Sequence, residues 1–106
     1  MRANNIYLGT EFKLNISIAP IESMTMDDYD FSVKVFCLPR EVITFEKSDA
    51  IRVDSNNYIL PVNTGLVGTG RIKCEVTAHI PDGDFHDGLR TEVACIDTGI
   101  DIVKSI

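Results

Sequence analysis

Apolar and polar residues alternate along several stretches of the chain, and this period of two predicts β-strands. In residues 10–18 every second side chain is apolar: Phe12, Leu14, Ile16 and Ile18. The clearest alternation runs through residues 71–80, where the apolar positions are Ile72, Cys74, Val76, Ala78 and Ile80. We expect each stretch to be a strand with one face in the core.

Further strands are predicted on both sides of these two. One spans residues 29–38 and places four side chains on its buried face: Phe31, Val33, Val35 and Cys37. Others are expected at residues 41–47, at 51–53 and 58–62 around an Asp/Asn/Ser turn, and at 89–96, resuming at 100–103. Asn and Asp tolerate the backbone angles of a tight turn, so residues 54–57 indicate a hairpin.

About seven short strands without amphipathic helical periodicity predict an all-β fold, an immunoglobulin-like antiparallel sandwich, with a small barrel as the alternative. The chain of 106 residues fits one domain, which we place at residues 9–106 behind an N-terminal arm of residues 1–8. Residues 19–28 form the one long connection and are a candidate for a helical turn.

Ten basic and sixteen acidic residues give a net charge of −6. Nucleic-acid binding depends on Lys and Arg that neutralise phosphates, so we expect no nucleic-acid partner. The first residues lack the apolar region of a signal peptide, and no stretch has the length of a membrane helix, so no membrane partner is expected. Cys37, Cys74 and Cys95 are then predicted to be reduced thiols, all three pointing into the core.

No motif predicts catalysis or a cofactor. The glycine-rich residues 65–71 match neither nucleotide-binding pattern, because a strand follows them. There is no G-x-S-x-G sequence, and no close Cys or His pair that would predict zinc. Asp27, Asp28 and Asp30 are expected to be solvated. The sequence therefore indicates a protein that is not an enzyme.

The loop at residues 81–88 is the most distinctive segment. Asp82, Asp84 and Asp87 are a weak candidate for a calcium site, although the spacing is not that of an EF-hand. The alternative is a loop in which these side chains bind their own backbone. Phe85 either folds back on the core or meets a partner, and His86 beside it is a second candidate contact.

Two other apolar groups are candidates for contact with a partner. Met24 and Met26 either cap one end of the sandwich or belong to an adaptable contact surface. In the N-terminal arm, Ile6, Tyr7 and Leu8 are apolar enough to dock on their own domain or on a neighbouring subunit.

Three segments together resemble small virion proteins of Bacteroidetes-infecting phages, including crAss-like phages and prophages: residues 9–14 (GTEFKL), 26–31 (MDDYDF) and 80–92 (IPDGDFHDGLRTE). Members of that group tend to read Asp-Phe-Pro-Asp-Gly in the last segment. Here His86 stands in place of the proline, so the resemblance does not extend to the rigidity that a proline gives.

The resemblance implies a non-enzymatic structural role in the virion, assembled in the bacterial cytoplasm. The expected function is that of a head-fibre or capsid accessory subunit, a homo-oligomer (dimer or trimer) that also contacts other virion proteins. The alternatives are a tail or baseplate protein, or a module that binds carbohydrate or the host surface.

Overall fold

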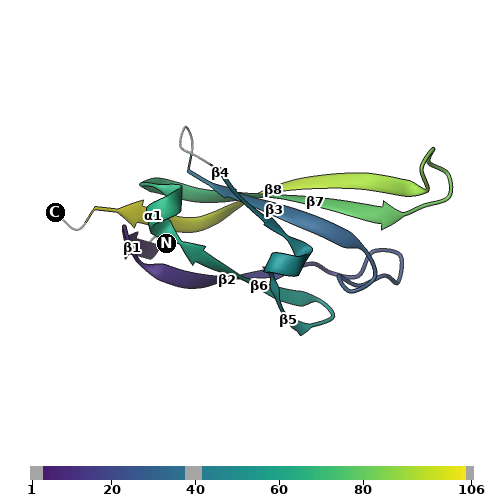
Figure 1. Ribbon diagram of the computed structural model, residues 1–106, viewed down its shortest axis with the longest axis horizontal. Coiled ribbons are helices and arrows are strands. Elements are labelled where there is room, and N and C mark those ends of the chain that lie inside the picture. Colours follow the sequence, from purple (N-terminus) through teal and green to yellow (C-terminus); the bar gives the residue numbers. More distant parts are fainter. Residues whose placement is uncertain (1–3, 38–41, 105–106) are drawn as a thin grey trace.

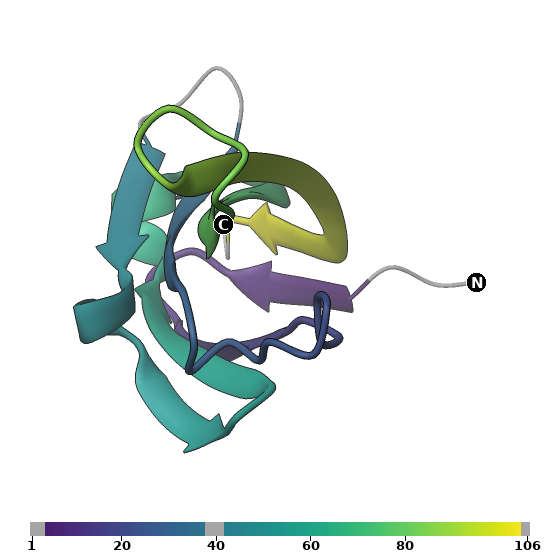
Figure 2. The same ribbon diagram turned by 90° about the vertical axis from the view of Figure 1, so that its right-hand side faces the viewer.

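The computed structural model describes residues 4–37 and 42–104. This part of the chain contains eight strands in two sheets, an all-β sandwich as predicted. The strands are β1 (Asn4–Tyr7), β2 (Glu11–Ser17), β3 (Asp30–Phe36), β4 (Val42–Glu46), β5 (Ile51–Asp54), β6 (Asn57–Asn63), β7 (Gly70–Pro81) and β8 (Leu89–Val103). Figure 2, a view along the long axis, shows the two sheets as facing layers.

The larger sheet has the order β1-β8-β7-β3-β4, and the smaller one has the order β2-β6-β5. Neighbouring strands are antiparallel except β1 and β8, which run parallel, with Asn4 opposite Ile100. The N-terminal arm therefore contributes a strand of its own. Asparagine is uncommon in strands, so the two asparagines of this segment do not favour one. The apolar–polar alternation of the sequence did not predict this strand for the same reason.

The core lies between the sheets and contains the side chains that the alternation predicted. Phe31, Val33, Val35 and Cys37 from β3 and the residue after it are buried, and so are the alternate residues of β7 from Ile72 to Ile80. Phe31 packs edge-on against Tyr58, with ring centroids 5.1 Å apart. These contacts join the two sheets, because Phe31 belongs to the larger sheet and Tyr58 to the smaller one.

The helical turn lies elsewhere than predicted. Residues 19–28 contain no helix; their chain reverses at Glu22 and Ser23, which have positive φ angles, between bridged Ile21 and Met24. Short helical turns instead follow two strands, as the 3-10 helix η1 (Lys47–Asp49) and the helix α1 (Thr64–Val67). An Asn63 side chain that accepts the Gly65 N–H starts α1, so the glycine-rich loop begins with a capped turn.

The hairpin of β7 and β8 is the longest element and dominates the shape of the molecule. Its strands have 12 and 15 residues, and the principal extents of the fold are 53 × 28 × 27 Å. In Figure 1 the hairpin projects to the right beyond the other strands, with its turn at the far end. The projecting part of β8 therefore lies beside few other parts of the molecule.

Candidate functional site

Strand β8 has one edge that is paired along its length and one that is largely open. On the first edge it pairs with β7 from Leu89 to Ile102. On the second it pairs with β1 only from Ile100 to Val103. No other described strand pairs with the second edge at residues 89–99. An edge of this kind presents unpaired N–H and C=O groups to which another strand can bind.

Apolar side chains lie exposed along this open edge. Leu89 is 41% exposed, Val93 58% and Ile96 45%, and Phe85 at the tip of the hairpin is 48% exposed. Scattered exposed apolar residues are common on proteins, but these belong to one hairpin. Their grouping beside an unpaired strand edge indicates a contact surface.

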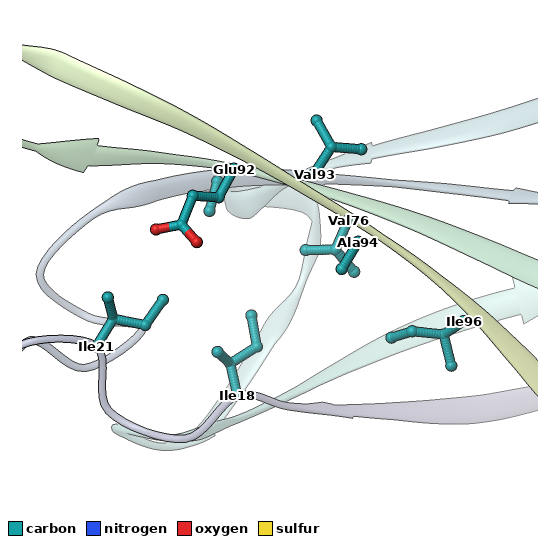
Figure 3. A pocket seen from close by; sticks show the side chains of 8 residues that line it. Ile18, Ile21, Val76, Glu92, Val93, Ala94 and Ile96 are labelled. Carbon is teal, nitrogen blue, oxygen red and sulfur yellow. The ribbon is translucent and has the colours of Figure 1, made fainter. Parts of the chain in front are cut away.

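An apolar groove separates the open edge of β8 from strand β2. One hollow is lined by Ile18, Ile21, Val76, Ala78, Glu92, Val93, Ala94 and Ile96. A second is lined by Leu14, Asn15, Ile16, Ser17, Cys74, Ile96, Asp97 and Thr98. Ile96 lines both, so the two hollows adjoin. Figure 3 shows Ile18 and Ile21 across the hollow from β8.

The groove lies between two open strand edges. Strand β2 pairs with β6 on one side, and no described strand pairs with its other side. The floor comes from β7, whose Cys74, Val76 and Ala78 are buried beneath it. Among the described strands the sandwich is therefore open on this flank, where core side chains lie directly below the groove.

An acidic cluster flanks the hairpin end of the groove. Arg90 contacts three carboxylates: those of Asp82 at 2.6 Å, Glu92 at 3.0 Å and Glu22 at 3.3 Å. The hydrogen bond to Glu92, then the hydrogen bond to Asp82 and the negative charge of Glu22, raise the pKa of Arg90. One guanidinium facing three carboxylates leaves a net negative charge here.

The predicted contact residues are divided between the core and the surface. Met26 is fully buried, and Met24 is half-buried against the core, so this pair caps the sandwich. Ile6 also packs on the core, whereas Tyr7 and Leu8 are exposed. Phe85 and His86 are exposed on the hairpin tip, so Phe85 does not fold back on the core.

Two of the three aspartates of the hairpin loop, Asp82 and Asp87, bind protein groups through their side chains. Asp82 binds Arg90 and accepts the backbone N–H of Asp84, and Asp87 accepts the backbone N–H of Leu89. Among residues 4–37 and 42–104, no three His, Cys, Asp or Glu side chains lie close enough to hold a metal ion. The geometry is that of the alternative, a loop that binds its own backbone.

The side chain of Cys95 lies on the face opposite to the predicted one. Cys37 and Cys74 are buried as expected, and burial raises the pKa of Cys74 to about 11. Cys95, predicted to point inward, lies exposed on the outer face opposite Glu75. It belongs to the run Val93-Ala94-Cys95-Ile96, which has no alternation from which to assign a face. That same run lies on the open edge, but no pattern within it marks the edge as unpaired.

Comparison of the chain with protein-family models, with curated proteins and with solved structures finds no match. Within the described residues, none of the helices has the length and apolar character required to span a membrane.

Proposed function

We propose that this protein is a non-enzymatic structural module that acts by contact with other proteins through the open edge of β8 and the hairpin tip. One observation carries the proposal: residues 89–99 of β8 have no strand partner on one side among the described residues, and apolar side chains lie exposed along them. Strand addition at an exposed edge is a common mode of protein recognition.

The assembly that we propose is a phage virion, with the protein as a head-fibre or capsid accessory subunit. The resemblance to Bacteroidetes phage proteins supports this, and its longest segment, residues 80–92, covers the hairpin tip and the start of the open edge. Self-association as a dimer or trimer and contacts with other virion proteins belong to the same proposal.

An immunoglobulin-like topology is also part of the proposal. Immunoglobulin domains pack an ABED sheet against a sheet containing C, F and G. We match β2, β6 and β5 to strands B, E and D, and we match β3, β7 and β8 to strands C, F and G. This match follows the chain order, and the observed sheet orders support it. In this comparison no described strand takes the place of strand A beside β2.

The carbohydrate-binding alternative lacks a comparable observation. Two aromatic side chains of the described residues are strongly exposed, Tyr7 on β1 and Phe85 on the hairpin tip. Figure 1 shows these elements at opposite ends of the long axis, so the two rings do not form one platform on which a sugar could stack.

Quantitative mass spectrometry of purified particles tests the virion role. In the organism that encodes the chain, particles isolated on a density gradient are expected to contain it in stoichiometric amounts. A photo-crosslinker at Val93 should join it to particle proteins, whereas one at exposed Lys13 serves as the control. Particles without the chain would contradict the virion role, and equal crosslinking at both positions would contradict the contact surface.

A further inference from the structure

We propose that the groove between β2 and β8 binds one extended segment of another polypeptide, with apolar residues at alternate positions and a basic residue near the hairpin end. The inference rests on the proposed function, because it names the kind of partner that the open edge would take. The segment pairs with the open edge of β8 and inserts alternate side chains between the sheets.

The length of the groove sets the length of the segment. Along β8 the lining extends from Glu92 to Thr98. At about 3.3 Å per residue, this stretch is roughly 20 Å long and matches a strand of about seven residues. Alternate side chains of such a strand point to one face, so three or four of them enter the groove. Its apolar lining favours Val, Ile or Leu at those positions.

The pairing of β1 shows which direction the segment can take. β1 binds the same edge of β8 in the parallel direction, starting opposite Ile100. A partner strand along residues 92–98 in the same direction would continue the line of β1, and its N-terminal end would lie at Glu92. The edge thus already accepts a parallel strand at one end, and the remainder is the open part.

Charge complementarity specifies the end residue and the class of partner. The N-terminal end of a parallel segment would meet the cluster in which Arg90 faces Glu22, Asp82 and Glu92, which favours Lys or Arg there. No Lys or Arg lines the two hollows of the groove. A second copy of this chain, with a net charge of −6, would add negative charge at this acidic end of the groove, so we assign the segment to a different polypeptide and self-association to surfaces other than the groove.

Titration of the isotope-labelled full chain with synthetic peptides, followed by NMR, tests the inference. The probe is Lys-Val-Thr-Val-Thr-Val-Thr-Val, which alternates apolar and polar residues behind one lysine. One control has the same composition in the order Lys-Val-Val-Thr-Thr-Val-Val-Thr, and another replaces Lys by Glu. We expect the alternating peptide to bind at least tenfold more tightly than the scrambled one and severalfold more tightly than the Glu peptide. Amide shifts should concentrate at residues 14–21 and 91–98.

Two matched variants separate groove binding from surface adhesion. Ala94 lines the groove and Cys95, the next residue, lies on the outer face, so Ala94→Arg should abolish binding and Cys95→Arg should leave it within twofold. The inference would be overturned if all peptides bound equally well or if none bound at 1 mM. Equal effects of the two variants on binding would also overturn it. Concentration-dependent shifts at residues 91–98 without peptide would also overturn it, because the occupant would then be a second copy. If the peptides do not bind while a crosslinker at Val93 still joins the protein to particle proteins, the proposed function stands. The inference that the groove binds an extended segment would then be wrong.

Discussion

Val76 and Ala94 face each other across β7 and β8, and the boundary of the core passes between them. They are paired in register, and both line the groove. Val76 is 5% exposed, whereas Ala94 is open to solvent. β7 is therefore an interior strand with a buried face, and the neighbouring part of β8 is an edge whose inner face lacks a cover.

Substitution of these two residues by aspartate should have very different effects. Val76→Asp places a carboxylate against the core and should lower the free energy of unfolding by about 3 kcal/mol or more, a large part of the stability of a small domain. Ala94→Asp places the same group at the open groove and should cost less than about 1 kcal/mol. Urea unfolding followed by circular dichroism measures both, and equal losses would contradict the boundary.

Thr64 joins the start of β2 to the end of β6 and should be sensitive to loss of its hydroxyl. Its side chain is fully buried, accepts the N–H of Gly9 at 2.8 Å and donates to the carbonyl of Thr10 at 2.8 Å. Thr64→Val keeps the shape but removes the acceptor of the Gly9 N–H and one of the two donors to the Thr10 carbonyl, which keeps the bond from the Thr64 N–H. This change should cost about 2 kcal/mol. Thr64→Ser keeps the hydroxyl and should retain more stability in the same unfolding experiment, whereas equal losses would assign the effect to packing.

The three cysteines should differ in reactivity. Cys95 is exposed, whereas Cys37 and Cys74 are buried, and burial raises the pKa of Cys74 to about 11. Thiolate is the reactive form, so one thiol per chain should react rapidly with a thiol reagent at pH 7.5 and three in denaturant. Cys95→Ser should remove the rapid reaction. Fast modification of two thiols in the folded protein would show that the core is open.

Asp27 should make stability depend on pH in the acid range. Its carboxylate accepts hydrogen bonds from Arg52 and from the Tyr58 hydroxyl at 2.6 Å, and these lower its pKa from 3.8 to about 2. The folded state thus binds a proton less readily than the unfolded chain, so the stabilisation is present above pH 3.8 and is lost as the pH falls towards 2.

Thermal melts from pH 5 to pH 2 check this dependence. The melting temperature of the native protein should fall over that range, and in Asp27→Asn the fall should be smaller, because one of the carboxylates with a lowered pKa is gone. An identical pH profile for both proteins would show that the Asp27 contacts contribute nothing to folding.

The strands with buried faces could be predicted from the sequence because alternation records burial on one side. Phe31, Val33 and Val35 in β3 and the alternate residues of β7 are buried as predicted. The hairpin of β5 and β6 also lies where the Asp/Asn/Ser turn placed it, with Asp54 opposite Asn57. Each prediction rests on local chemistry, either a period of two or a turn residue.

The candidate site was beyond this reasoning because it depends on pairing between distant segments. Cys95 was assigned to the wrong face, since the run from Val93 to Ile96 has no period. The pairing of β1 with only the last residues of β8 joins the two ends of the chain, and no local pattern encodes it. The open edge is the part of β8 that β1 leaves uncovered, so it could not be located from either segment alone.

Amide hydrogen exchange measured by NMR on the isolated full chain tests the central claim that this edge of β8 is open. Within residues 91–97, the amides that bond to β7 should be protected and the alternate amides that face the groove should exchange rapidly, at both low and high protein concentration. Protection of every amide in this stretch would contradict the account, because the edge would already be covered.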